Sequence, residues 1–418
     1  MNVHSLRYAV RTLIGPWVVL PAAVLEVLNF VQRGMPWRGE TLWTVDWFAI
    51  SLFIIGPLIA GAAAVDASRL TRPGNIHLVV GVSQPHRPYL RAAAWCAGPV
   101  AAVHMLAILA GLTFGGLSSS TSWLLILTAI LVQILAIGWY VAIGSAIGRF
   151  ASPLIAGAGA ALGSFTLIYL LGEGGKDVFE PLALGGATVS RLGYEYDPGY
   201  LIAQVAVFAG TGILLLILPI RMRSGVRVPT AAGLSLALAV AGVIAAGPYA
   251  FPSDRLTASP KAPTRCTGTQ PTICLYPEHE RFEAQLVGHI QTLSGAAKAK
   301  GYPSFVPNRV EEISRTYRVN GKGTLGLDIQ ADAYATGTID IADIAVELVR
   351  PLHCEQLYTG APPGEAYWQR EMSLHATLLS LAGLKVNEED YPQQIKILSP
   401  EQVRAIFADY DRCNLEGV

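Results

Sequence analysis

The amino-acid sequence predicts a membrane all-α bundle of about seven transmembrane helices, followed by an α+β domain in water. The 418-residue chain is 52% hydrophobic and only 14% charged, whereas an average soluble protein carries about 25% charged residues. Charged residues are sparse up to Ala246 and reach an ordinary density after Pro252. The predicted parts are a transmembrane domain over 1–247, a linker over 248–264 and an extracytoplasmic domain over 265–418.

The first residues predict a helix that lies on the inner membrane surface. Apolar residues spaced from Leu6 to Ile14 share one helical face, and Arg7 and Arg11 flank that face. Such a pattern is typical of an interfacial helix. The segment has no small-residue cleavage site after a short apolar core, so we do not expect a removable signal peptide.

The membrane part contains seven candidate spans. A helix needs about 20 mostly apolar residues to cross a bilayer. The segments that meet this condition are approximately Pro16–Val31, Asp46–Val65, Ala92–Phe114, Ser122–Ile147, Pro153–Leu171, Gly199–Ile220 and Val228–Ala246.

Positive charges in the short loops predict the orientation of these spans. If seven helices alternate, most loop arginines fall on one side, and the net acidic connection 173–198 falls on the other. The N-terminus is therefore expected in the cytoplasm and the C-terminal domain outside. Trp37, Trp43 and Trp47 lie at the outer ends of the first two spans, where we expect them to act as interfacial anchors.

Two features of the membrane part suggest a solute path. Glu26 lies deep in the first span, where a carboxylate is costly unless it is paired or faces a polar cavity. We expect Glu26 to line a pathway or to form a buried hydrogen bond, with exposure to lipid as the alternative. The connection 173–198 is too long for a tight turn, and its part from Phe179 to Leu192 is apolar enough to dip into the membrane.

The polar, basic loop from Val65 to Arg91 has a characteristic order of parts. Asp66 and Arg69 end one span, a Pro-Gly turn follows, 76–82 is suited to a short apolar-faced helix, and 83–87 opens the next span. This order resembles the first cytoplasmic loop of type-2 ABC exporter permeases. The resemblance covers about the first 220 residues; the seventh span and the outer domain lie beyond it.

The resemblance implies a partner ATPase. The chain has no GxxxxGK[ST] loop to cradle phosphates, because Asp177 follows Lys176 in its nearest approximation. No cofactor is therefore expected on this chain itself, which would not be an enzyme, and ATP and Mg²⁺ would bind to the separate ATPase subunit. The residues expected to contact that ATPase are Asp66, Arg69, Arg72, Ile76, Val80, Arg87 and Arg91.

Further partners follow from the same comparison. The resemblance implies a homodimer or a pair with a second permease subunit, in contact with the lipid bilayer and without nucleic acid. The Ala-, Gly- and Arg-rich composition suggests a GC-rich bacterial genome, so the membrane is expected to be a bacterial plasma membrane. The alternative is a membrane sensor that binds an extracellular ligand or protein through its C-terminal domain and moves no solute.

The C-terminal domain shows helix and hairpin signals. A helical stripe begins at Phe282 and ends near Gly301, and two more helices are expected at 340–349 and 366–381. Ser399 begins a capped helix with Pro400 and Gln402. Segments 315–319 and 324–329 are expected to pair as a hairpin through Asn320-Gly321.

Four of the five cysteines lie in this domain. An even number in one small domain fits two disulfides in an oxidising compartment, and four reduced cysteines in a cytoplasmic domain are the alternative. Three connectivities are possible. We favour Cys266 with Cys274, which bracket a short loop, and Cys354 with Cys413, which would attach the last helix.

No catalytic or metal-binding motif is evident. His279-Glu280 begins like a zinc-protease helix, but Glu283 stands where the second histidine belongs. His289, His353 and His375 have no metal-like spacing, and we expect structural or surface roles for them. A membrane-anchored enzyme is therefore the least favoured class, since a Gly-x-Ser-x-Gly elbow is also missing from the sequence.

Overall fold

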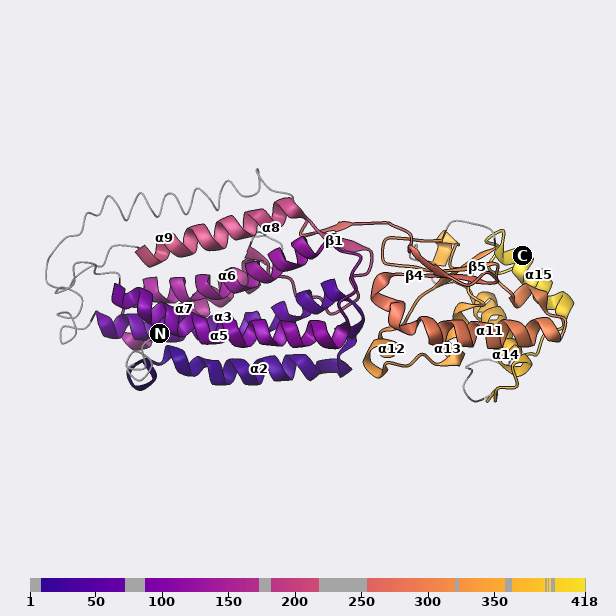
Figure 1. The fold of residues 1–418 in the computed structure, drawn as a ribbon, viewed down its shortest axis with the longest axis horizontal. Coiled ribbons are helices and arrows are strands. Elements are labelled where there is room, and N and C mark those ends of the chain that lie inside the picture. The colour runs from indigo at the N-terminus through magenta and orange to yellow at the C-terminus, as the bar shows by residue number, and fades with distance from the viewer. Residues whose placement is uncertain are drawn as a thin grey trace.

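The computed structural model describes residues 9–71, 87–172, 182–217, 254–319, 323–357, 363–387, 389, 391 and 395–417. These residues form two bodies placed end to end, a helical bundle and a smaller body that combines helices with a sheet (Figure 1). The N-terminal end of the described chain lies at the end of the bundle far from the second body, and the C-terminal end lies on the second body.

Five helical stretches of the described chain are long and apolar enough to cross a membrane: Gly15–Gly34, Thr41–Leu70, Arg87–Gly115, Trp123–Gly148 and Pro198–Leu216. A further apolar helix, Pro153–Tyr169, is shorter. Five of the seven predicted spans therefore have a membrane-length counterpart, and the fifth predicted span corresponds to the shorter helix. The seventh, 228–246, lies outside the described residues.

The bundle is built from consecutive helices. Their bounds are η1 Gly15–Val18, α2 Val19–Val31, η2 Gln32–Gly34, η3 Pro36–Gly39, α3 Thr41–Leu70, α5 Arg87–Gly115, α6 Trp123–Gly148, α7 Pro153–Phe165 with its π-helical extension η5 Thr166–Gly172, and α8 Pro198–Val205, which continues through η7 Ala206–Thr211 into α9 Gly212–Ile217. Residues 9–12, part of the predicted interfacial segment, are also helical.

Helix α3 is the centre of the bundle because small residues let α6 approach it closely. A Cβ atom on Gly144 would lie 2.0 Å from the backbone oxygen of Ala60, and one on Gly148 would lie 2.2 Å from that of Ala64. Small residues at such contacts allow direct backbone packing between apolar helices.

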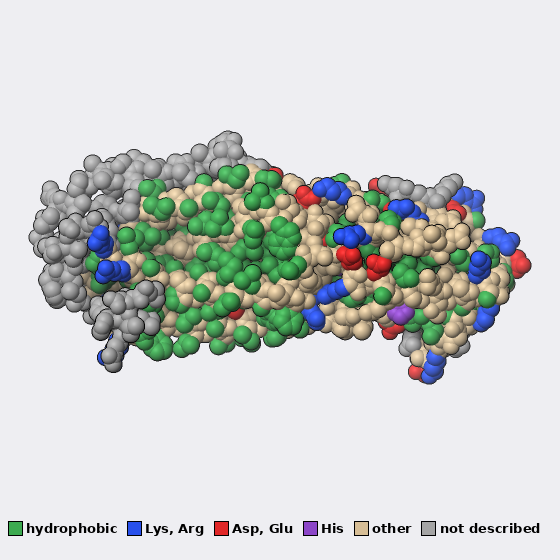
Figure 2. Space-filling model, viewed as in Figure 1, with side chains coloured by type: hydrophobic (Ala, Val, Ile, Leu, Met, Phe, Trp, Pro, Cys, Tyr) green, Lys and Arg blue, Asp and Glu red, His purple; other side chains and the backbone are tan. Residues whose placement is uncertain are grey.

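The bundle presents an apolar surface. Figure 2 shows hydrophobic side chains over its visible face and charged side chains mainly at its far end and on the second body. Val27, Leu124 and Leu154 are 62%, 73% and 84% exposed. Extended apolar exposure of this kind is unusual for a water-soluble monomer. Together with the five apolar helices, it is compatible with a multi-pass membrane protein.

The second body contains a four-stranded sheet in the order β3-β4-β5-β6. Its strands are β3 Arg265–Thr267, β4 Thr272–Leu275, β5 Arg309–Glu312 and β6 Thr324–Leu327. Strands β3 and β4 are antiparallel, whereas β4–β5 and β5–β6 are parallel. A parallel pair needs a crossover connection, which α11 (Glu283–Ala299) supplies between β4 and β5.

The predicted hairpin is wrong. Segment 324–327 is a strand, but it pairs in parallel with β5, and 315–319 contains no strand. The turn residues Asn320-Gly321 lie outside the described residues. Parallel pairing extends the sheet and buries Leu327 to 1% exposure; this tertiary burial outweighs the local turn preference that suggested a hairpin.

The predicted helices of this body are confirmed. They correspond to α11, α13 (Ile341–Glu347), α14 (Glu365–Leu381) and α15 (Pro400–Tyr410). Ser399 and Gln402 form the expected capping box at α15. Four further elements are helical in the described part of this body: η8 Pro277–Phe282, η9 Pro303–Phe305, α12 Ala331–Thr336 and η10 Glu355–Leu357. Figure 1 shows α11, α13 and α14 packed beside the sheet, with α12 next to the bundle.

The connection 173–198 and the expected linker 248–264 meet where the two bodies join. Strand β1 (Tyr194–Tyr196), which lies within the 173–198 connection, pairs antiparallel with β2 (Leu256–Ala258). Strand β2 thus lies within the expected linker 248–264 and fixes it to the bundle side. Residues 183–189 have no helix, and Leu184 and Ala187 are buried against the bundle core.

Candidate functional site

We call the end of the bundle that lies far from the second body the inner end, and the opposite end the outer end. Asp66 holds the inner end. This residue is 1% exposed, and its carboxylate accepts hydrogen bonds from the backbone N–H groups of Ile14 (2.9 Å) and Gly15 (2.7 Å). A guanidinium nitrogen of Arg69 lies 4.0 Å away. Asp66 was predicted as an ATPase contact, but the structure places its carboxylate inside the bundle, where it positions the chain that leads into α2.

The other predicted coupling residues divide into two groups. Arg87 and Arg91 are exposed on the first turns of α5, and the side chain of Arg69 is 41% exposed. Figure 2 shows basic side chains at this end of the bundle. Arg72, Ile76 and Val80 lie outside the described residues. The described part of the predicted loop therefore contributes an exposed basic surface rather than a complete binding site.

A buried arginine ties the inner ends of three helices together. Arg149, which follows α6, is 3% exposed and lies 4.7 Å from the ring centroid of Tyr89 on α5. Its Nη2 donates a hydrogen bond to the backbone oxygen of Leu216 on α9 (2.7 Å). A cation over an aromatic face and a backbone acceptor together compensate burial of the charge.

The middle of the bundle contains a polar network centred on Glu26. Its Oε1 lies 2.7 Å from Nδ1 of His104 and accepts a 2.7 Å hydrogen bond from the hydroxyl of Ser51. Nε2 of His104 lies 2.8 Å from Oε1 of Gln133. The Nε2 amide of Gln133 in turn donates to the backbone oxygen of Val45 (2.9 Å).

This network joins four helices. Glu26 is on α2, Ser51 and Val45 on α3, His104 on α5 and Gln133 on α6. The four polar side chains are at most 5% exposed. Glu26 therefore forms buried hydrogen bonds, as expected, and is not exposed to lipid. Sequence reasoning missed His104 and Gln133. Their polar character within apolar runs was the only available signal, because pairing over 78 residues leaves no local pattern.

The outer end, next to the second body, is held by a second buried carboxylate. Asp46, near the start of α3, is 0% exposed and forms ion pairs with Arg255 and with Arg191, whose Nε lies 3.6 Å away. Arg255 also lies over the ring of Tyr196, 5.5 Å from its centroid. Since Arg255 directly precedes β2, this contact attaches the beginning of the second body to the bundle.

A cluster of acidic residues and a histidine fills the junction. Glu40 accepts hydrogen bonds from the hydroxyl of Ser190 (2.5 Å) and the backbone N–H of Arg191 (2.7 Å). Burial raises the pKa of Glu40 to about 7, although nearby His279 and these two donors lower it. Burial alone would lower the pKa of His279, but the hydrogen-bonded carboxylate of Glu312, together with Glu40 and Glu278, outweighs burial and raises the pKa.

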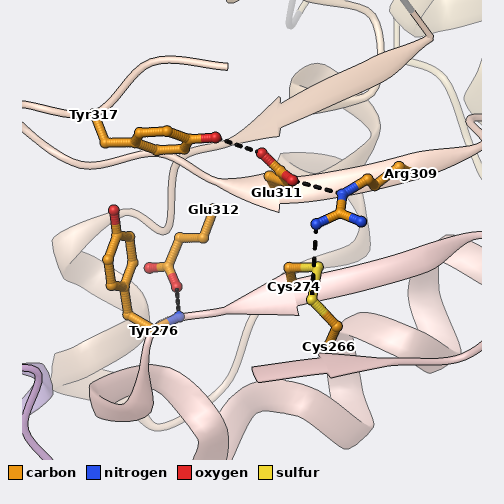
Figure 3. Close-up of a disulfide and its surroundings, with 7 residues drawn as sticks. All are labelled: Cys266, Cys274, Tyr276, Arg309, Glu311, Glu312 and Tyr317. Atoms are coloured by element: carbon orange, nitrogen blue, oxygen red, sulfur yellow. Dashed lines mark hydrogen bonds and ion pairs between the residues drawn. A yellow bond between two sulfur atoms is a disulfide. The ribbon is translucent and has the colours of Figure 1, made fainter. Parts of the chain in front are cut away.

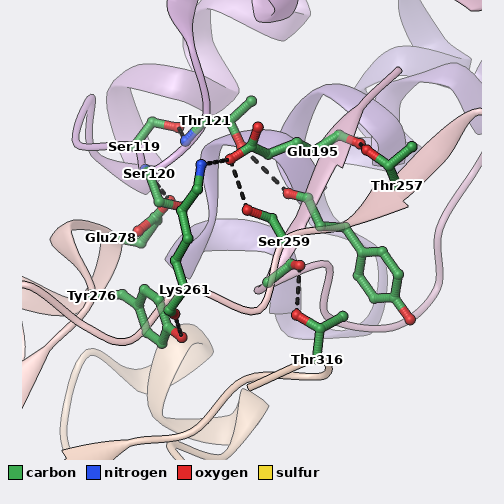
Figure 4. Close-up of polar contacts among 12 residues, drawn as sticks. Ser119, Ser120, Thr121, Glu195, Thr257, Ser259, Lys261, Tyr276, Glu278 and Thr316 are labelled. Atoms are coloured by element: carbon green, nitrogen blue, oxygen red, sulfur yellow. Dashed lines mark hydrogen bonds and ion pairs between the residues drawn. The ribbon is translucent and has the colours of Figure 1, made fainter.

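More polar contacts cross the junction in Figure 4. Glu278 accepts from the backbone N–H and the hydroxyl of Ser120, at 2.5 and 2.6 Å. Lys261 lies 2.7 Å from the carboxylate of Glu195, and the hydroxyl of Thr316 donates to the backbone oxygen of residue 193 (2.7 Å). The second body is therefore attached to the loop between α5 and α6 as well as to α3.

The predicted interfacial role of the tryptophans is wrong. Trp37, Trp43 and Trp47 are 0%, 2% and 1% exposed. The indole N–H of Trp43 donates to the backbone oxygen of Ala187, and that of Trp47 donates to the backbone oxygen of Asn29. The second body and the 182–197 segment cover this end of the bundle, so these rings pack inside the protein instead of meeting lipid headgroups.

The second body contains the two disulfides of the favoured pairing. Cys266–Cys274 joins directly opposed residues of β3 and β4, beside Arg309 (Figure 3). Cys354–Cys413 attaches the end of the chain to the segment before η10. His353, Cys354 and Cys413 lie close enough for a shared metal ion, but the two sulfur atoms are already bonded to each other and are not thiolate ligands.

The three other histidines of this body have structural contacts. In each, Nε2 lies within hydrogen-bonding distance of a backbone oxygen: His289 with Ile339, His353 with Tyr410 and His375 with Ala342. These contacts agree with the structural roles predicted for them. Comparison of the chain with protein-family models, with curated proteins and with solved structures finds no match.

Proposed function

We propose that this chain is the membrane subunit of an ATP-driven exporter of the type-2 ABC class, working with a separate ATPase that binds ATP and Mg²⁺. The observation that supports this proposal most directly is the inner end of the bundle. Exposed Arg87 and Arg91 begin α5 immediately after the predicted coupling segment, and Asp66 anchors the chain before α2 to the end of α3. A soluble partner beneath this surface would act on α2, α3 and α5 together.

The proposal also gives the chain an orientation. Basic residues at the inner end favour a cytoplasmic position in a bacterial plasma membrane. The second body lies at the opposite end of the bundle (Figure 1), where an oxidising compartment would maintain its two disulfides. The chain would span the membrane seven times and pair with a second copy or with another permease. Glu26 would lie beside the path of the solute.

Charge reversal at the inner end tests the proposal. We expect the double variant Arg87→Glu, Arg91→Glu to bind the ATPase about tenfold more weakly, equivalent to about 1.4 kcal/mol. The assay is a mild-detergent pull-down of the tagged chain, followed by mass spectrometry. The control reverses two exposed charges on the second body, Lys385→Glu with Arg404→Glu, and should bind like the wild type.

Two results would contradict the proposal. In one, the wild-type chain brings down no protein with a nucleotide-binding cassette. In the other, such a protein is recovered equally well with the Arg87, Arg91 variant, although that variant inserts into the membrane normally.

A membrane sensor is the second candidate, and the junction favours it. The contacts of Arg255 with Asp46 and of Glu278 with Ser120 connect the second body to α3 and to the α5–α6 loop. A ligand that moves the second body would therefore act on the bundle without any solute passing through it. Reconstituted vesicles distinguish the two functions: an exporter accumulates solute when ATP and its ATPase are present, and a sensor changes only its protease protection when ligand is added.

A further inference from the structure

We infer that Glu26 and His104 together form a proton-binding site in the middle of the bundle, and that the bound proton holds four helices together. Gln133 and Ser51 each lie ten residues from the outer ends of α6 and α3, about 15 Å along a helix axis. The inference is independent of the proposed function, because it rests only on the hydrogen bonds of this network.

The hydrogen bond between Gln133 and Val45 determines which atoms of the network carry hydrogen. Its backbone oxygen can only accept a hydrogen bond, so the group of Gln133 that lies 2.9 Å away must be the NH₂. The side-chain oxygen of Gln133 then faces Nε2 of His104 at 2.8 Å. This ring nitrogen must therefore carry a hydrogen. The reversed amide would place two oxygen atoms in contact at Val45.

The second ring nitrogen completes the count. Nδ1 of His104 lies 2.7 Å from Oε1 of Glu26, and two arrangements satisfy this contact. Either an imidazolium donates to a carboxylate, or a carboxylic acid donates to a neutral imidazole that carries its hydrogen on Nε2. Each contains one proton more than a carboxylate beside a neutral imidazole. The binding step is the addition of one solvent proton to the pair, which changes its net charge from −1 to 0.

On the described helices around Glu26, no other charged residue is placed to neutralise its carboxylate instead of this proton. Helix α6 has no charged residue, and Glu26 is the only one on α2. The charged groups of the other neighbouring helices are at their ends: Asp46, Asp66 and Arg69 on α3, and Arg87 and Arg91 on α5. Asp46 is already paired with two arginines. An isolated buried carboxylate is costly, so a neutral pair is the stable form.

The second carboxylate oxygen of Glu26 also supports a neutral Glu26–His104 pair. Oε2 is buried and has no hydrogen-bond partner among the residues that the structure describes. A fully charged carboxylate normally accepts hydrogen bonds at both oxygens when it is buried. Here both hydrogen-bond partners of Glu26, Ser51 and His104, lie at Oε1.

Loss of the proton would change the contacts between helices. Neutral His104 would donate to Glu26 through Nδ1, and its Nε2 would become an acceptor that faces the oxygen of Gln133. Gln133 would then have to turn its NH₂ toward His104 and give up its hydrogen bond to Val45. The proton therefore determines whether α6 remains bonded to α3 at this level.

The test is the hydrogen carried by each ring nitrogen of His104. The full chain, labelled with ¹⁵N at its eight histidines, is placed in lipid nanodiscs at neutral pH, and the His104 signal is assigned by its loss in His104→Gln. We expect a hydrogen on Nε2 in the wild type. Glu26→Gln should keep that hydrogen, because its amide donates to Nδ1, and should abolish the response of Nδ1 to alkaline pH.

Asn29→Ala serves as the control, because Asn29 is buried on the same helix but bonds to Trp47 outside the network. It should give the wild-type signal and the wild-type pH response. A wild-type His104 without a hydrogen on Nε2 overturns the inference, and so does a Glu26→Gln variant whose Nδ1 responds to pH like the wild type. If Glu26→Gln fails to fold, the state of Nε2 in the wild type still decides.

Discussion

Replacing Arg255 by methionine is expected to destabilise the bundle more than any other single change at the junction. Asp46 is 0% exposed, and the variant leaves it with Arg191, whose Nε is 3.6 Å away, as its remaining partner. Removing one partner of a buried ion pair typically costs about 3–5 kcal/mol. Because Arg191 still compensates part of the charge, we expect about 3 kcal/mol.

The buried thiol of Cys96 provides the assay. All five cysteines lie in the described residues, four of them form disulfides, and Cys96 is 1% exposed in the bundle. A thiol-reactive fluorophore therefore reports unfolding of the bundle alone. At about 2–4 °C per kcal/mol for a unit of roughly 200 residues, Arg255→Met should lower the melting temperature by about 6–12 °C.

Lys261→Met is the matched control. Its ion pair with Glu195 crosses the same junction, but the lysine side chain is 73% exposed, and exposed pairs contribute at most about 1 kcal/mol. The double variant Asp46→Asn, Arg255→Met should recover part of the loss, because it removes the unpaired charge. If Arg255→Met melts at the same temperature as Lys261→Met, the buried pair does not hold this end of the bundle.

Three other changes test separate parts of the structure. Gly144→Ala places a Cβ 2.0 Å from the backbone oxygen of Ala60 and should lower the stability by about 1–3 kcal/mol or more in the same melting assay. The control is Gly138→Ala, whose added Cβ meets no atom within 4 Å and which should keep the wild-type melting temperature. Equal melting temperatures of the two variants would contradict close packing of α3 and α6. The double variant Cys354→Ser, Cys413→Ser removes a disulfide between residues 59 apart without leaving a new thiol, and it should cost the second body about 4 kcal/mol. We expect faster proteolysis of that body with unchanged Cys96 labelling, and unchanged proteolysis would contradict this expectation. The pKa of Glu40 is raised from 4.5 to about 7, so between these pH values the folded protein holds a proton that the unfolded chain has released. The free energy of unfolding should therefore fall on the order of 3 kcal/mol as pH rises through this window. Glu40→Gln should flatten the plot of stability against pH, and an unchanged slope would assign the pH dependence to other groups.

The sequence predicted elements whose signals are local. Hydropathy located the spans because a lipid-facing helix needs no knowledge of its neighbours. The capping residue Ser399 located the start of α15, and the predicted helix 366–381 differs from α14 by one residue. Paired cysteines were likewise suggested by number and spacing, although spacing alone left three connectivities open.

Features that depend on the packing of distant segments were missed. The aromatic side chains Trp43 and Trp47 occupy positions typical of a membrane interface, and only the docking of the second body makes them internal. Asn320-Gly321 is a strong hairpin signal, yet β6 gains more burial beside β5. For Glu26, the cost of burial predicted that a partner must exist, but the identity of His104 depends on which helices are neighbours.

Three of the buried carboxylates of the bundle, Asp66, Asp46 and Glu26, show how depth determines the way a charge is compensated. At the inner end, backbone N–H groups bond to Asp66. At the outer end, two arginines that approach from outside the bundle pair with Asp46. Neither kind of group reaches Glu26, since α2 has intact helical backbone there and arginines lie only at the helix ends. In the inferred site, the proton held with His104 makes the pair neutral, and a proton, unlike a backbone group or an arginine, can leave. The middle of the bundle would therefore be a level at which the net charge changes while the chain stays folded, and helix α3, which contributes to all three levels, would carry that change to both ends.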